Sequence, residues 1–118
     1  MFPGIDIIEI ARFTRACTRH PQLLSRLFTS GELKAMSDKK YNSWAARFAG
    51  KEAVLKALGT GLNGLTWHDI EIFTNERGEP VVYLSERAQK IALSRGGKTV
   101  KLSLAHSKEN AIAIAILE

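Results

Sequence analysis

The sequence predicts an α+β fold in a single domain, with helices packed on an antiparallel sheet. Three observations lead to this class. Helical periodicity dominates the first half of the 118-residue chain, strand alternation dominates the second half, and the length suits one hydrophobic core. No internal repeat or low-complexity linker divides the chain, so we expect residues 1–118 to form one domain.

The composition narrows the class of protein. Hydrophobic residues make up 45% and charged residues 25% of the chain, which argues against disorder. The formal net charge of +5 favours an anionic partner: nucleic acid, an acidic protein or a phosphate-rich small molecule. Zinc-finger and helix-turn-helix signatures are missing, as is the interleaving of aromatic and basic residues that single-strand binders use. Nucleic acid is therefore the less favoured partner.

The sequence also bears on the compartment. The single cysteine, Cys17, excludes an internal disulfide and is typical of a reducing cytoplasm. The longest apolar run, from Ala111 to Leu117, is too short to cross a membrane, and nothing resembles a signal peptide. We therefore expect a cytoplasmic protein with no membrane segment.

The segment from Phe2 to Ile8 predicts a short strand that contains one acidic residue. Asp6 lies inside the apolar run Ile5-Asp6-Ile7-Ile8, where an unpaired carboxylate would cost several kcal/mol. Two interpretations remain open. Asp6 either faces solvent at a sheet edge or caps the next helix, or it is a ligand for a metal or another cation.

Two short helices are expected next, over residues 9–18 and 22–28, the second opened by Pro21. Three arginines recur at helical spacing: Arg12, Arg15 and Arg19. Such a stripe is either a solvated face or a docking surface for an acidic partner. The spacing of Thr29 and Glu32 is that of a capping box, so a third helix should begin there.

The central helix organises the chain. The stretch from Ala46 is long, rich in alanine and free of proline, and Gly59 is well placed to end the helix. One arc of the helix holds only small residues suited to close packing: Ala46, Gly50, Ala53 and Ala57.

Three features of this helix indicate a polyanion site that includes one carboxylate. Arg47 and Lys51 are like charges one turn apart, which is unfavourable unless an anion lies between them. Glu52 and Lys56 form either an ordinary helix salt bridge or part of the same site. The loop Gly59-Thr60-Gly61 is either a simple turn or a set of amides that approach a phosphate.

The second half predicts two hairpins and a helix. Strands are expected over residues 68–73 and 80–84, and a helix over residues 86–95 capped by Ser85. Residues 98–105 and 111–117 alternate and should pair with each other. Asp69 and Glu71 should lie on the wet side of their strand. His106 stands at a strand end, where it is either structural or part of a ligand site.

Several motifs together resemble one family. They are Gly4-Ile5-Asp6-Ile7 with Glu9 and Arg12, the block Arg47 to Ala53, its continuation Lys56 to Gly61, Asp69-Ile70-Glu71-Ile72, Gly78 with Pro80, and Ser103-Leu104-Ala105-His106. This pattern extends nearly end to end and resembles the holo-(acyl-carrier-protein) synthase family, the small-subunit type of 4′-phosphopantetheinyl transferase. The central block is the most specific part.

The resemblance implies transfer of the phosphopantetheine arm of coenzyme A to a serine of an apo acyl carrier protein, with release of adenosine 3′,5′-bisphosphate. It also implies dependence on Mg²⁺ and a homotrimer with active sites between subunits. The implied metal ligands are Asp6 and Glu52, and Lys56 completes the catalytic set. The implied coenzyme-binding residues are Arg47, Lys51, Lys56, Gly59, Thr60, Gly61 and His106. The implied docking surface for the acidic carrier protein includes Arg12 and Arg19.

The chemistry of the residues agrees with this family, because Mg²⁺ is commonly held by one or two carboxylates together with substrate phosphates. The acceptor of the serine proton is either Glu52 itself or a metal-bound water held by Asp6. Ala105 and Asn110 depart from the family pattern, which often has a hydroxyl residue and an aromatic residue there. The alternatives are a small basic module that binds nucleic acid without catalysis and a trimeric scaffold without turnover.

Overall fold

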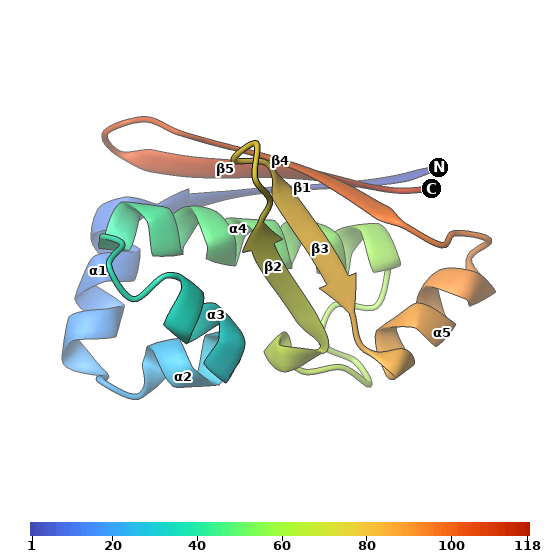
Figure 1. The fold of residues 1–118 in the computed structure, drawn as a ribbon, viewed down its shortest axis with the longest axis horizontal. Coiled ribbons are helices and arrows are strands. Elements are labelled where there is room, and N and C mark those ends of the chain that lie inside the picture. The colour runs from blue at the N-terminus through green and yellow to red at the C-terminus, as the bar shows by residue number, and fades with distance from the viewer.

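A computed structural model describes all 118 residues and confirms the α+β class. The elements in chain order are β1 (Phe2–Glu9), α1 (Ile10–Arg19), α2 (Leu23–Leu27), α3 (Ser30–Ala35), α4 (Tyr41–Leu58), the 3₁₀ helix η1 (Trp67–Asp69), β2 (Ile70–Thr74), β3 (Pro80–Leu84), α5 (Glu86–Ser94), β4 (Val100–His106) and β5 (Asn110–Leu117). Figure 1 shows α4 in the middle of the molecule, with the other elements arranged around it.

The strands form two antiparallel sheets. One has the order β1-β5-β4, and the other is the hairpin β2-β3. The predicted pairing of the last two strands is confirmed, and β1 pairs with the free edge of β5 along its whole length. Figure 1 shows the three-stranded sheet above α4, α1–α3 below α4, and the hairpin crossing in front of it. The central helix is therefore covered from both sides, which explains why its apolar residues do not form a single stripe.

The small residues of α4 allow the close packing that the sequence predicts. Ala53 and Ala57 are fully buried, and Gly4 of β1 lies directly against them. A Cβ atom at Gly4 would collide with the Ala53 carbonyl oxygen and would lie 2.7 Å from the Ala57 nitrogen. The buried alanines of β5 also face α4, so the sheet lies unusually close to the helix. This approach sets the position of Asp6, two residues after Gly4.

The predicted ends of several helices are confirmed. Thr29 and Glu32 form a complete capping box at α3, and the Ser85 side chain caps α5. Gly59 ends α4 in the left-handed conformation, with φ 81°.

One expectation about the hairpin is wrong. The strand begins at Ile70 rather than at residue 68, and the preceding Asp69 is buried rather than exposed. Its carboxylate accepts hydrogen bonds from the Thr66 amide (2.7 Å), the Ser85 hydroxyl (2.6 Å) and Arg87 (2.7 Å). The partners at Ser85 and Arg87 are distant in the sequence and cannot be read from the local alternation.

The outer face of the three-stranded sheet is apolar and open. It presents four isoleucines whose residues are between 41% and 61% exposed: Ile5, Ile7, Ile112 and Ile114. No element of the chain covers this face (Figure 1). None of the helices combines the length and the apolarity that a membrane crossing needs.

Candidate active site

The fold brings Asp6 of β1 next to Glu52 of α4. Burial, and next the negative charge of Asp6, raise the pKa of Glu52, while Lys56 partly offsets both effects. Two carboxylates that influence each other in this way lie within electrostatic range. The first strand therefore lies against the central helix, as a metal site shared by Asp6 and Glu52 requires.

Lys56 completes this group. Its ammonium donates hydrogen bonds to Asp6 Oδ1 (3.0 Å) and to the Ile5 carbonyl oxygen (2.8 Å). The ordinary Glu52–Lys56 helix salt bridge does not form, because Lys56 turns to Asp6 instead. About half of the Lys56 side chain is exposed, and one N–H donor remains for a ligand. We name Asp6, Glu52 and Lys56 the carboxylate site.

The carboxylate site has the chemistry of a cation site that needs further ligands. Asp6 Oδ2 is buried and has no hydrogen-bond partner, and Glu52 accepts no hydrogen bond in the chain. A buried carboxylate oxygen without a donor is costly unless a cation meets it. No group of three or more metal-ligating side chains occurs in the structure. Two carboxylates fit Mg²⁺, which commonly takes its remaining ligands from water and phosphates.

Arg47 and His106 lie in a different place. Both line a cavity of about 580 Å³ between α3, α4, the β2–β3 hairpin and the end of β4, together with Lys39 and Thr74. The Arg47 guanidinium donates to the Ile72 carbonyl oxygen (3.3 Å) and to the Thr74 hydroxyl, which leaves further N–H groups for a ligand. We name this the basic cavity. Its mixture of cationic and apolar walls suits a nucleotide.

The carboxylate site and the basic cavity are on different sides of α4. Arg47 and Glu52 are five residues apart, which corresponds to about 140° around a helix. Arg47 points to β2, whereas Glu52 points to Asp6 on β1. One chain therefore presents two parts of the predicted site rather than one continuous pocket.

The prediction that Lys51 binds the coenzyme is corrected by the structure. Lys51 is fully buried, and its three N–H donors go to Glu32 Oε1 (2.6 Å) and to the carbonyl oxygens of Leu27 (2.8 Å) and Trp67 (3.1 Å). No donor remains for a phosphate. The spacing of Arg47 and Lys51 predicted an anion between them. That anion is the carboxylate of Glu32 in the same chain, whose negative charge acts to raise the pKa of both residues.

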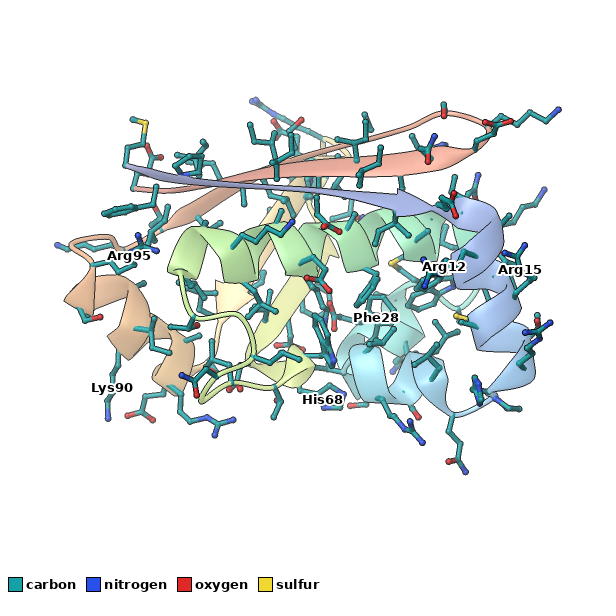
Figure 2. The ribbon with its side chains drawn as sticks, turned by 180° about the vertical axis from the view of Figure 1, so that it is seen from behind. Arg12, Arg15, Phe28, His68, Lys90 and Arg95 are labelled. Atoms are coloured by element: carbon teal, nitrogen blue, oxygen red, sulfur yellow. The ribbon has the colours of Figure 1, made fainter.

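The loop Gly59-Thr60-Gly61 follows directly after the carboxylate site. The C-terminus of a helix carries partial negative charge, so the loop attracts a phosphate only through its amides and nearby cations. Lys56 is one such cation, and Arg95 is another. The Arg95 guanidinium donates to the Ala57 carbonyl oxygen (3.1 Å) and lies 3.9 Å from the centre of the Phe2 ring. Figure 2 shows Arg95 beside the end of α4.

The proposed docking arginines lie on α1, at the opposite end of α4 from Arg95 (Figure 2). Arg12 and Arg19 are both exposed. Arg12 lines a mostly apolar cavity of about 370 Å³ between β1, α1 and α2, and Arg19 lines a small polar cavity with Arg26. The surface is therefore basic with an apolar hollow.

Sequence reasoning missed two residues. Lys39 lies in the basic cavity, but a lysine in a polar loop gives no signal of its own. Glu32 was assigned only to a helix cap, although it also pairs with Lys51. A cap residue that can reach a buried lysine is visible only when the helices are packed together.

The chain is similar to a known protein family over nearly its whole length. The family model of the 4′-phosphopantetheinyl transferase superfamily matches residues 3–116, nearly the whole chain. The chain belongs to this superfamily. A holo-[acyl-carrier-protein] synthase of Moorella thermoacetica is 46% identical, with 98% of this chain and 91% of that protein covered. The corresponding protein of Caldanaerobacter subterraneus is 42% identical, with 98% and 93% covered.

Solved structures of holo-[acyl-carrier-protein] synthases have the same fold as this chain. The holo-[acyl-carrier-protein] synthase of Neisseria meningitidis has a TM-score of 0.90 at 30% identity, with 99% of this chain and 97% of that chain covered. The Helicobacter pylori enzyme in complex with coenzyme A has a TM-score of 0.87 at 30% identity, with 98% and 99% covered. The fold of this phosphopantetheinyl transferase is therefore that of the synthases.

Proposed function

We propose that this chain transfers the 4′-phosphopantetheine group of coenzyme A to a serine of an apo acyl carrier protein and releases adenosine 3′,5′-bisphosphate. The superfamily, the similarity to holo-[acyl-carrier-protein] synthases and the coenzyme A complex of the H. pylori enzyme support this activity. The observation that carries the proposal is the partnerless, buried oxygen of Asp6 beside Glu52 and Lys56.

The reaction is a phosphoryl transfer. The serine oxygen forms a bond to the β-phosphorus of coenzyme A, and the pyrophosphate bond from that phosphorus to the leaving bisphosphate breaks. Glu52 accepts the serine proton, because burial and the negative charge of Asp6 raise its pKa and make its carboxylate more basic. Lys56 donates from its free N–H to the oxygen that gains negative charge.

Asp6 and Glu52 are the residues that would hold a Mg²⁺ ion. The unpartnered oxygen of Asp6 and the raised pKa of Glu52 fit a cation between them. When bound, Mg²⁺ neutralises charge on the pyrophosphate. The protein's own contribution is the rigid approach of β1 to α4, which holds both carboxylates in place.

The coenzyme would use both parts of the site. The basic cavity, with Arg47, His106 and Lys39, takes the nucleotide end of coenzyme A, whose negative phosphates and flat base match its cationic and apolar walls. Lys56 and the Gly59–Gly61 loop meet the pyrophosphate.

We further propose a homotrimer in which the carboxylate site of one subunit meets the basic cavity of its neighbour. Two observations support this assembly. The two parts of the site face different sides of α4, and the outer sheet face exposes isoleucines that no element covers. Exposed apolar patches of this kind mark interfaces between proteins.

The acidic carrier protein would dock on α1. Exposed Arg12 and Arg19 provide positive charge, and the apolar cavity at Arg12 provides a contact that is not ionic. We place this activity in the cytoplasm, in agreement with the single buried cysteine, which remains reduced there.

A mass measurement tests the activity. Purified protein with Mg²⁺ and coenzyme A should increase the mass of an apo acyl carrier protein by one phosphopantetheine. Asp6→Asn and Glu52→Gln should each abolish the increase and keep the wild-type circular dichroism spectrum. Glu76→Gln, in the exposed hairpin turn, is the matched control and should retain full transfer. Full transfer by either carboxylate variant would refute the assignment of the carboxylate site.

Mixed trimers test the shared site. Glu52→Gln and Arg47→Ala trimers should each be inactive, because every site lacks one part. Co-expression of the two chains should restore about a quarter of the sites. A site is complete only when one subunit supplies an intact Glu52 and its neighbour an intact Arg47, and each of these has a probability of about one half in randomly mixed trimers. No restored activity would show that both parts of a site come from the same chain.

A further inference from the structure

The buried ion pair of Lys51 and Glu32 calls for an explanation that coenzyme binding does not give. The side chains are 0% and 1% exposed, with 2.6 Å between Lys51 Nζ and Glu32 Oε1. Lys51 also joins the end of α2 and η1 to α4 through the carbonyl oxygens of Leu27 and Trp67. A buried ion pair costs much of its own attraction in desolvation and is often no more stable than apolar side chains of the same volume. Stability alone therefore does not account for it.

Glu32 connects this pair to the open edge of β2. Its Oε2 atom accepts a hydrogen bond from the Ile72 amide (2.8 Å), and Oε1 also accepts one from the Thr29 amide (2.9 Å). On the same edge, Arg47 donates to the carbonyl oxygen of Ile72 (3.3 Å). Both backbone groups of Ile72 therefore bond to side chains of α3 and α4 rather than to a neighbouring strand.

This edge of β2 is a wall of the basic cavity. Ile72 and Thr74 line it, and Arg47, which bonds to both of them, supplies its guanidinium. Any movement of β2 away from α4 would therefore shift the Arg47 guanidinium and widen the cavity. Figure 2 shows Phe28 in the interior below α4, where it is buried and its ring centre lies 5.0 Å from Lys51 Nζ.

We propose that Lys51 and Glu32 are positioning residues for the nucleotide end of coenzyme A. The pair fixes the edge of β2 against α4 and so holds the Arg47 guanidinium and the cavity wall in the geometry that binds the nucleotide. Neither residue touches the coenzyme. This inference rests on the proposed function, since it takes the basic cavity as the nucleotide site.

The test compares variants that alter the pair in different ways. Glu32→Asp keeps both charges but withdraws the carboxylate by one methylene, and Glu32→Gln with Lys51→Met removes both charges while filling similar volume. The Kd of adenosine 3′,5′-bisphosphate is measured by calorimetry, and the KM values for coenzyme A and for apo carrier protein by the mass assay. Ala92→Gly, in the buried face of α5 outside the cavity, is the control for a general loss of stability.

We expect the Kd of the bisphosphate and the KM for coenzyme A to rise about tenfold or more in both pair variants. In Glu32→Asp the KM for carrier protein should stay within about twofold, because Lys51 keeps its bond to the Leu27 carbonyl oxygen and the docking surface on α1 is not altered. Ala92→Gly should lower the melting temperature and leave the Kd unchanged. Glu32→Asp is the smaller change and keeps the test available should the double variant fail to fold.

Two negative results have different meanings. Wild-type protein that neither binds the bisphosphate nor modifies a carrier would overturn the proposed function itself. In the second case the wild-type protein binds the bisphosphate and modifies the carrier, while the pair variants keep the wild-type Kd and the wild-type KM for coenzyme A. That result would overturn the positioning role and leave the ion pair as a structural contact.

Discussion

Replacing Gly4 with alanine should separate the two carboxylates of the proposed site without altering either of them. A Cβ atom at this position would collide with the Ala53 carbonyl oxygen and lie 2.7 Å from the Ala57 nitrogen. Both atoms belong to the backbone of α4, so neither can rotate away. Ordinary contact begins near 3.4 Å, so the contact with the Ala57 nitrogen alone requires β1 to move by about 0.7 Å, and the closer contact with the Ala53 oxygen requires a larger shift.

The magnitude follows from this displacement. Overpacking of this kind costs about 1–3 kcal/mol of stability. Because Asp6 follows Gly4 by two residues on the same face of β1, it moves away from Glu52 with the strand. Displacement of a reacting group by roughly 1 Å lowers turnover by about 100-fold. We therefore expect Gly4→Ala to retain its fold and lose nearly all transfer activity.

The assay is the mass increase of apo carrier protein, with urea unfolding measured at equal protein concentration. Gly64→Ala is the matched control: its φ of 82° makes alanine unfavourable, but no atom lies within 4 Å of the new Cβ. It should lose stability and keep its turnover. Wild-type turnover and stability in Gly4→Ala would refute the reasoning that this close approach positions the site.

Three further predictions concern assembly, pH and docking. Ile114→Lys should convert the proposed trimer to monomers in light scattering and abolish transfer, because it places a charge in the proposed apolar interface. Leu93→Lys on α5 should change neither property. Burial acts to raise the pKa of Asp69, but its hydrogen bonds and the charge of Arg87 lower that pKa to about 2. The ionised carboxylate therefore adds roughly 2.5 kcal/mol to the free energy of unfolding at neutral pH, and this contribution is lost as the pH falls from about 5 to 2. Asp69→Asn should flatten this part of the unfolding profile; an unchanged profile would contradict the pKa assignment. Arg12→Glu should raise the KM for carrier protein about tenfold, and the effect should be smaller at high salt. Lys90→Glu, at the far end of the molecule (Figure 2), should leave this KM unchanged. Equal effects of the two variants would refute the assignment of the docking surface to α1.

Local sequence signals predicted most elements correctly because those signals act over a few residues. The Thr29–Glu32 capping box, the Ser85 cap and the end of α4 at Gly59 all depend on neighbours within one helical turn. The pairing of β4 with β5 follows from two alternating segments joined by a short turn. Asp69 was misjudged because its partners at Ser85 and Arg87 lie far along the chain.

Sequence patterns were enough to predict the class of fold, the central helix and the residue types of the proposed site, including Asp6, Glu52, Arg47 and His106. Which of these side chains meet depends on how the strands pack against α4, and that packing joins residues far apart in the sequence. It placed Asp6 beside Glu52, turned Arg47 to the other side of the helix and buried Lys51 against Glu32. The local sequence does not distinguish a basic residue that contacts phosphate from one that neutralises an internal carboxylate, and only the packing of the chain does so.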